Sequence, residues 1–211
     1  KILSEFQHLP DMGEYMHRSY FDGSDKYCKD TFLFIKYLGT NFLPKLLSIK
    51  RRFDQIVEKF NFFPSNFSDR ILQFMSQIFP DHLPKSMRDY RNRFEHYMLF
   101  LASDSTIDQM QELLDSETSN QQDYEYIKFT KLEGQDALLH RYVAGAAPAR
   151  YRIINSNDAG QLLPLDIALP RNCHSWHEIL PQEILQRMAQ SFQMGHFLCM
   201  VFHWDFVVKK G

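Results

Sequence analysis

Apolar residues recur at helical spacing in the first half of the chain. From Asn41 they follow one another at intervals of four, three, four, three and four residues, which places them on one helix face. They are Phe42, Leu46, Ile49, Phe53, Ile56 and Phe60. Pro44 suits the first turn of this helix, and residues 61–64 end it. A second apolar stripe over residues 71–79 predicts another helix, with Ser68 as its N-cap.

The remainder of the chain alternates between strand-like and helix-like patterns. We expect strands at GEYMHR (13–18), YEYIKFT (124–130) and LLPLDIALP (162–170), and a final strand or pair of strands at GHFLCMVFHWDFVV (195–208). Pro164 places its strand at an edge or a bulge. Helices are expected at ILSEFQHL (2–9), residues 103–117, residues 132–147 and LPQEILQRMAQSF (180–192). Residues 87–103 read as a helix, or as a helix passing into a strand.

This order predicts an α+β fold, an antiparallel sheet covered by helices, with a mainly helical subdomain inserted into it. We place the sheet-bearing cap domain at residues 1–30 and 97–211. The helical insertion is placed at residues 31–96.

Composition excludes several classes of protein. The 211 residues are 44% hydrophobic, enough for a core, and the formal net charge of -2 argues against a nucleic-acid binder. Three separated cysteines favour neither a disulfide scaffold nor a structural zinc site. No apolar run approaches the roughly 18 residues that a membrane-spanning helix needs, and the first residues do not resemble a signal peptide. We expect the chain to be a piece of a longer protein.

Charge is distributed in blocks. Residues 31–100 carry a net charge of +5, whereas residues 101–137 carry -7. The basic block can bind an anionic membrane surface, where each Lys or Arg contributes roughly 1 kcal/mol. It can equally be a solvated helical subdomain with its own core, or dock an acidic protein partner. The candidate membrane-binding residues are Lys45, Lys50, Arg51, Arg52, Lys59, Arg70, Lys85, Arg88, Arg91 and Arg93.

Two histidines interrupt the last apolar run. His196 and His203 are seven residues apart, so on one straight strand they would face opposite sides. They can reach one site only if the run between them contains a bulge or a turn; otherwise one faces solvent and the other is an ordinary half-buried residue. Arg141, in an expected helix, could hold a carboxylate with its planar fork or lie solvated on the surface. The sequence contains no glycine-rich phosphate loop and no HExxH, GxSxG or EF-hand motif.

Seven stretches resemble the family of bacterial respiratory, quinone-dependent D-lactate dehydrogenases, and they extend over nearly the whole chain. They are GEYMHR (13–18), KYCKDTF (26–32), FFPSNFSDR (62–70), FPDHLPKSMRDYR (79–91), LHRYVAGAAPARY (139–151), LDIALPRN (165–172) and GHFLCMVFHWDFVVKKG (195–211).

The resemblance implies a flavoprotein with an FAD-binding domain, a cap domain and a discontinuous, helical membrane-binding domain. Such an enzyme oxidises D-lactate to pyruvate, passes electrons to membrane quinone and sits peripherally on the cytoplasmic face of the bacterial inner membrane. This chain would be the cap and membrane-binding portion, without the FAD-binding domain, and inactive alone.

The resemblance also implies roles for the candidate residues. FAD-dependent 2-hydroxy acid dehydrogenases carry a GHxGDGNxH motif whose two histidines help to hold the substrate; Gly195, His196 and His203 match it. This chain has FLCMVF in place of the glycine-rich turn, and we assign no metal to it. Arg141 matches an arginine that binds the substrate carboxylate, whereas Pro164 stands where relatives carry a lysine. The alternatives are a dehydrogenase for another D-2-hydroxy acid and a non-catalytic interaction domain.

Overall fold

A twisted antiparallel sheet forms the centre of the molecule. The computed structural model describes residues 9–60, 62–64, 66–120, 124–170, 173 and 180–211. Within these residues one five-stranded sheet has the strand order β2-β1-β4-β5-β3, and every neighbouring pair is antiparallel. The strands are β1 (Met12–His17), β2 (His96–Leu101), β3 (Ala159–Ala168), β4 (Met188–His196) and β5 (Val201–Lys209).

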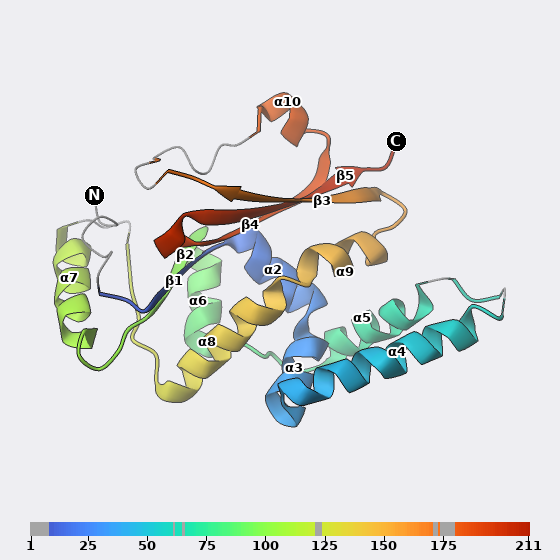
Figure 1. Ribbon diagram of the computed structural model, residues 1–211, viewed down its shortest axis with the longest axis horizontal. Helices are drawn as coiled ribbons and strands as arrows, with labels where there is room; N and C mark the ends of the chain where they lie inside the picture. Colours follow the sequence, from blue (N-terminus) through green and yellow to red (C-terminus); the bar gives the residue numbers. More distant parts are fainter. Residues whose placement is uncertain (1–8, 61, 65, 121–123, 171–172, 174–179) are drawn as a thin grey trace.

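Helices cover one face of this sheet (Figure 1). The covering helices are α2 (Arg18–Tyr27), α8 (Lys131–Ala144) and α9 (Ala147–Ile154), while α10 (Gln182–Leu185) lies on the other side. Further from the sheet are α3 (Lys29–Leu38), α4 (Leu43–Val57), α5 (Phe67–Ile78), α6 (Lys85–Arg93) and α7 (Ile107–Asn120). Helices α4 and α5 pack side by side as a hairpin that projects from the body at the lower right of Figure 1.

The alternation of side chains along the strands builds a core on each face of the sheet. Met16, Phe192 and Val207 point into the core shared with α2, α8 and α9. Phe202 and Trp204 point to the opposite face, where they form a second apolar cluster. Both clusters exclude water almost completely, so the sheet is fixed by burial from two sides.

The predicted fold class is confirmed: the protein is α+β, an antiparallel sheet with helices packed on it. Pro44 lies in the first turn of α4, as expected. β3 is an edge strand, so Pro164 needs no ladder partner on its outer side. Residues 85–101 are a helix followed by a strand. The domain boundaries at residues 30 and 96 stay predictions.

Three local expectations were wrong. Residues 124–130 form no strand, because side-chain contacts hold them instead of a ladder: Glu125 pairs with Arg93 and Tyr126 bonds to Asp115. In the region 180–192, α10 is a single turn and β4 begins at Met188, because pairing with β5 buries Phe192 in the core. Ser68 lies inside α5 rather than capping it. The helix expected at residues 2–9 falls almost entirely outside the described residues.

A tight hairpin connects the last two strands. β4 ends at His196, residues Phe197–Cys199 form a 3-10 turn, and Met200 adopts a left-handed conformation with φ of 56° before β5 begins. Gly195 lies directly opposite Phe202 in the ladder. A Cβ atom at Gly195 would stand 2.5 Å from Cδ1 of that ring, so the hairpin requires glycine there.

Two histidines are buried in the core beneath the sheet. His140 is fully buried against Phe21, and its Nε2 hydrogen-bonds to the Ser24 hydroxyl. His82 packs on Phe32, with its ring centroid 5.9 Å from that of His140. Burial lowers the pKa of His140 to about 3 and that of His82 to about 4, although Asp25 opposes the shift at His82. Both rings are therefore neutral in the folded protein near pH 7.

Replacing Gly195 by alanine should destabilise the protein, because the new methyl group must displace the buried Phe202 ring. Overpacking of this kind costs about 1–3 kcal/mol in the free energy of unfolding, measurable by urea denaturation. Gly134→Ala is the matched control: its Cβ would meet no atom closer than 3.9 Å, and it lies within α8. The control should be neutral or stabilising by up to about 1 kcal/mol. Equal stability of the two variants would contradict the hairpin packing described above.

The free energy of unfolding should fall as the pH drops from about 6.5 towards 4. Above that range His82 and His140 are neutral in both states. Within it the unfolded chain binds their protons and the folded protein does not, because the folded pKa values are lowered. Each histidine contributes up to about 1.4 kcal/mol per pH unit in this window. Denaturant titrations between pH 7.5 and 4.5 should show a shallower slope for His82→Gln. An unchanged slope would refute this account.

Candidate functional site

The hairpin turn brings the two candidate histidines to one side of the sheet. His196 pairs with Val201 and His203 pairs with Met194, and paired residues in an antiparallel ladder share a face. The turn thus reverses the alternation that separates residues seven apart on a straight strand. The two rings meet edge to face, with centroids 5.1 Å apart.

Arg141 reaches this pair from α8. Its Nε donates to Glu14 Oε2 at 2.8 Å, and its Nη2 lies 2.7 Å from the same oxygen. Nη2 also lies 3.0 Å from Nδ1 and 3.2 Å from Nε2 of His196. The structure therefore brings Arg141, His196 and His203 together, as the sequence analysis required for a single site. Their roles in catalysis stay predictions.

Carboxylates orient both imidazole rings. Nδ1 of His196 lies 2.9 Å from Glu14 Oε1, and Nδ1 of His203 hydrogen-bonds to Asp166, its partner on β3. A ring that donates from Nδ1 keeps Nε2 as its acceptor. Tyr20 donates to Asp205, and burial raises the pKa of that carboxyl although the hydrogen bond opposes the shift. We call these seven residues the polar cluster: Glu14, Tyr20, Arg141, Asp166, His196, His203 and Asp205.

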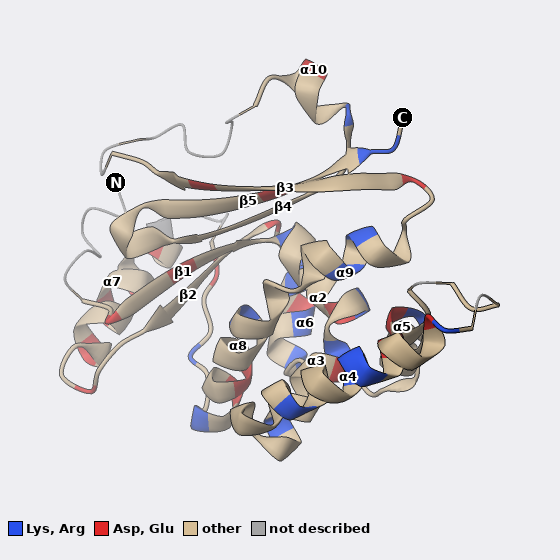
Figure 2. Ribbon diagram, turned by 45° about the vertical axis from the view of Figure 1, so that its right-hand side comes forward, with Lys and Arg blue, Asp and Glu red and all other residues tan. Residues whose placement is uncertain are grey.

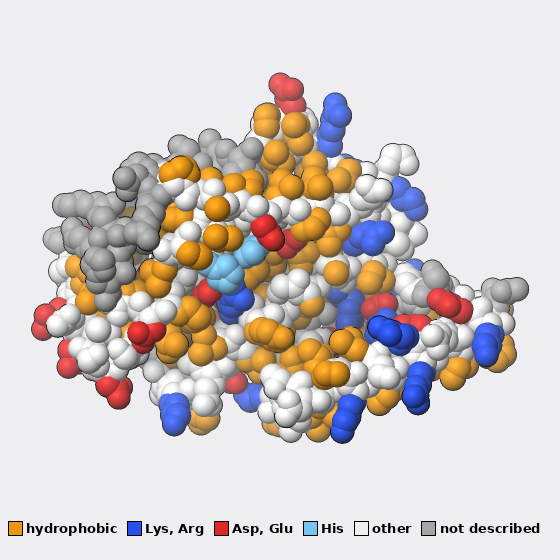
Figure 3. Space-filling model, viewed as in Figure 1, with side chains coloured by type: hydrophobic (Ala, Val, Ile, Leu, Met, Phe, Trp, Pro, Cys, Tyr) orange, Lys and Arg blue, Asp and Glu red, His pale blue; other side chains and the backbone are white. Residues whose placement is uncertain are grey.

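The polar cluster is open to solvent at its centre. Figure 3 shows histidine side chains at the surface, between acidic and basic side chains and within a surround of apolar groups. A guanidinium can bind a small anion, and a neighbouring imidazole can accept a proton from that anion. Within the part of the chain that the structure describes, no group of three His, Cys, Asp or Glu side chains is arranged to hold a metal ion.

Four members of the polar cluster were not predicted from the sequence. Glu14 had a signal, since a lone carboxylate inside the strand MGEYMH needs a partner if that strand is buried. Asp166 and Asp205 lie in two of the expected strands, which became β3 and β5. Their place beside the histidines depends on how β3 and β5 pair, and the sequence does not reveal that register. Tyr20 gave no signal, because it is one of ten tyrosines.

The α4–α5 hairpin presents its apolar side chains to solvent. In α5, Phe74 and Ile78 are 63% and 67% exposed, and Phe62 between the helices is 90% exposed. In α4, Ile49, Phe53 and Ile56 of the predicted stripe are also exposed. Apolar patches of this extent mark interaction surfaces on soluble proteins. Among the described residues, no helix is long and apolar enough to span a membrane.

Polar groups attach this hairpin to the body. The buried side of α5 consists of Ser68, Asp69, Gln73 and Ser76. Lys50 of α4 bonds to Asp69 at 3.0 Å, and Arg150 of α9 lies 3.6 Å from Asp69 and 3.4 Å from Asp30. Ser76 donates to Asp30 at 3.0 Å. The usual polarity of an amphipathic hairpin is therefore reversed, with charges inside and apolar groups outside.

The ten candidate membrane-binding cations fall into two sets. Figure 2 shows the Lys and Arg positions along α4 and the neighbouring helices. Four are held in ion pairs: Lys50, Arg88, Arg91 and Arg93. Among the described residues no ion pair engages the other six, which are exposed: Lys45, Arg51, Arg52, Lys59, Arg70 and Lys85. Most of this second set lies on the α4–α5 hairpin next to the exposed apolar side chains.

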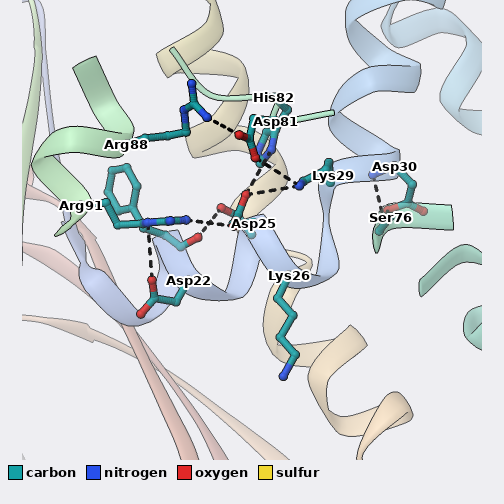
Figure 4. A network of polar contacts seen from close by, with 12 residues as sticks. Asp22, Asp25, Lys26, Lys29, Asp30, Ser76, Asp81, His82, Arg88 and Arg91 are labelled. Atoms are coloured by element: carbon teal, nitrogen blue, oxygen red, sulfur yellow. Dashed lines mark hydrogen bonds and ion pairs between the residues drawn. The ribbon is translucent and has the colours of Figure 1, made fainter. Parts of the chain in front are cut away.

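A second polar network lies between α2, α5 and α6 (Figure 4). It borders a cavity of about 410 Å³. Arg91 lies 2.9 Å from Asp25, Lys29 lies between Asp25 and Asp81, and Arg88 pairs with Asp81. Because these charges already neutralise one another, the network explains how α6 is attached to α2 and not how a ligand would bind.

Comparison with known proteins gives one consistent family. The model of the family described as "D-lactate dehydrogenase, membrane binding" matches residues 1–211. Proteins named quinone-dependent D-lactate dehydrogenase from Haemophilus influenzae and Escherichia coli are each 42% identical to this chain and match 100% of it. One from Corynebacterium glutamicum is 36% identical over 96% of the chain. The chain spans about 37% of the length of the first two relatives. With a family match over its whole length, the chain belongs to the family of D-lactate dehydrogenase membrane-binding regions.

Proposed function

We propose that this chain is the cap and membrane-binding portion of a quinone-dependent D-lactate dehydrogenase, in which it helps to oxidise D-lactate to pyruvate and docks the enzyme on a membrane. The relatives named for that activity support the proposal. The observation that carries it is the convergence of Arg141, His196 and His203 on one face of the sheet. The electron acceptor would be a membrane quinone.

Arg141 is suited to hold the substrate carboxylate. Glu14 engages two of its five N–H groups, Nε and one on Nη2, and His196 faces the second N–H of Nη2. The two N–H groups of Nη1 remain, and these can donate to a carboxylate in charge-assisted hydrogen bonds. A small 2-hydroxy acid anchored in this way would place its hydroxyl group close to the two imidazole rings.

His203 is the better candidate for the base that takes the hydroxyl proton. Its Nδ1 bonds to Asp166, which leaves Nε2 with a free lone pair. Among the described residues no hydrogen-bond partner engages that nitrogen. His196, by contrast, already faces both Glu14 and Arg141. A carboxylate behind an imidazole holds the ring in the tautomer that accepts a proton and stabilises the cation that forms.

The described part of the chain contains one antiparallel sheet and no βαβ unit with a glycine-rich turn, the motif that holds the pyrophosphate in doubly wound dinucleotide-binding folds. FAD, which supplies the redox chemistry when bound, would be held mainly by an FAD-binding domain of the same full-length polypeptide. What this chain contributes is positioning of the substrate and acceptance of a proton.

The α4–α5 hairpin is suited to bind an anionic phospholipid surface. Exposed Phe and Ile side chains can enter the headgroup boundary while Lys45, Arg51, Arg52 and Lys59 contact lipid phosphates. The helices would lie in the plane of the membrane and bind it peripherally. By the family resemblance we propose the cytoplasmic face of the bacterial inner membrane.

In the full-length enzyme, His203→Ala should lower the rate of D-lactate oxidation about 10²–10⁴-fold, the usual contribution of a positioned general base. Quinone-dependent turnover of purified enzyme measures this. His96→Ala changes an exposed histidine on β2 outside the polar cluster; it is the matched control and should stay within about 3-fold of the wild type. Unchanged oxidation by His203→Ala would reject its catalytic role. Faster turnover of another D-2-hydroxy acid by the wild type would correct the substrate.

Anionic vesicles should capture this chain at low salt and release it as salt rises. The double reversal Arg51→Glu with Arg52→Glu should weaken capture at least about 30-fold, because each lost cation contributes about 1 kcal/mol. The matched control reverses Lys209 and Lys210, which are exposed at the C-terminal end of β5, away from the hairpin (Figure 1).

Equal capture by neutral and anionic vesicles, or by neither, would contradict the lipid surface. A stable complex with an acidic protein in place of vesicle binding would favour a protein-docking domain instead.

A further inference from the structure

Glu14 is a buried carboxylate in a central strand. It lies on β1 between β2 and β4, directly opposite His196 in the ladder, and is 5% exposed. Removing a carboxylate from water costs several kcal/mol unless cations and hydrogen bonds compensate. An apolar residue of similar size would avoid that cost, as Met16 does two residues later on the same face. The position of Glu14 therefore needs an explanation beyond packing.

The two oxygens of Glu14 hold two different partners. Oε2 accepts from Arg141, with Nε at 2.8 Å and Nη2 at 2.7 Å. Oε1 lies 2.9 Å from Nδ1 of His196. Two contacts to one guanidinium fix its plane, and therefore the direction of the donors that remain. A single carboxylate thus joins the arginine of α8 to the last residue of β4.

The same contacts determine where the proton of His196 lies. An imidazole nitrogen cannot donate and accept at once, and the Glu14 carboxylate can only accept. Nδ1 therefore carries the proton, and Nε2 is the ring nitrogen left to accept from Nη2 of Arg141, which lies 3.2 Å from Nε2 and 3.0 Å from Nδ1. The ring lies between a carboxylate and a guanidinium, and the contact with the carboxylate sets the tautomer.

We propose that Glu14 is a positioning residue, whose buried carboxylate fixes both the plane of the Arg141 guanidinium and the Nδ1–H tautomer of His196. It acts through these two groups and does not touch substrate itself. The inference rests on the proposed function, because it makes Glu14 the residue that prepares the substrate-carboxylate site.

The first test compares Glu14→Gln with the wild type in the full-length enzyme. The amide keeps the size of the side chain but carries no charge and only one acceptor oxygen, so it cannot accept from Arg141 and His196 at once, and its hold on the guanidinium weakens. We expect KM for D-lactate to rise about 10–100-fold, as for the loss of other supporting hydrogen bonds at active sites, and kcat to fall much less. Glu95→Gln is the matched control, since Glu95 also pairs with a histidine, His17 at 3.4 Å, outside the polar cluster. A wild-type KM in Glu14→Gln would overturn the proposal.

The second test is a double-mutant cycle. It remains informative if Glu14→Gln alone folds poorly. Arg141→Met removes the clamp and should itself raise KM. If Glu14 acts through Arg141, adding Glu14→Gln to that background should change KM by less than about 3-fold, because the group it positioned is gone. The double mutant has no unpaired buried charge at this position, because both charged residues are replaced, so it should fold. If instead the two substitutions raise KM by factors that multiply, the proposal is overturned.

The third test reads the tautomer directly and does not depend on turnover. Histidine-selective ¹⁵N NMR of the full-length enzyme above pH 8, assigned with His196→Gln, should show His196 protonated at Nδ1 in the wild type. Glu14→Gln should shift it towards the Nε2–H form, while His203, bonded to Asp166, stays unchanged. An Nε2–H form in the wild type would overturn the proposal. If the enzyme does not oxidise D-lactate, the proposed function fails, and this measurement still decides the role of Glu14.

Discussion

The arrangement of the helices depends on pairing buried carboxylates with arginines. Glu14, Asp30 and Asp69 are all buried, and none could stay charged there without a cation. Arg141 of α8 meets Glu14, while Arg150 of α9 meets Asp30 and Asp69. The first pair fixes α8 against β1, and the other two fix α9 against α3 and α5. Removing one partner would leave a buried charge unpaired, a larger penalty than the loss of an exposed ion pair.

These pairs permit the reversed polarity of the α4–α5 hairpin. An ordinary surface hairpin attaches through its apolar stripe, so that stripe cannot also serve as a binding surface. Here Asp69 and Ser76 make the attachment, through Arg150 and Asp30, and the apolar residues are left exposed. Cations on α4 serve two purposes: Lys50 joins α4 to α5, whereas Arg51 and Arg52 face outward.

The proposed substrate site and the proposed membrane surface lie on different parts of the molecule and share helices. α9 follows α8 after a short turn; α8 carries Arg141 into the polar cluster, and α9 carries Arg150 to the hairpin. The core between them contains His140 and His82, which stay neutral near pH 7 because burial lowers their pKa values. Rigid packing there holds the two surfaces at a fixed separation.

Local periodicity and the geometry of proline were enough to predict the fold class, the strand at residues 13–18, the helix after Pro44 and an edge or bulge position for Pro164. It also indicated Arg141 and the two histidines. Only the tertiary structure decided that the histidines meet, since this needs a turn with Met200 in a left-handed conformation. Likewise, only the structure showed that Ile49 and Phe53 face solvent and that Glu14 joins the site. Periodicity shows which residues share a face, but the partner of that face depends on contacts between residues far apart in the chain.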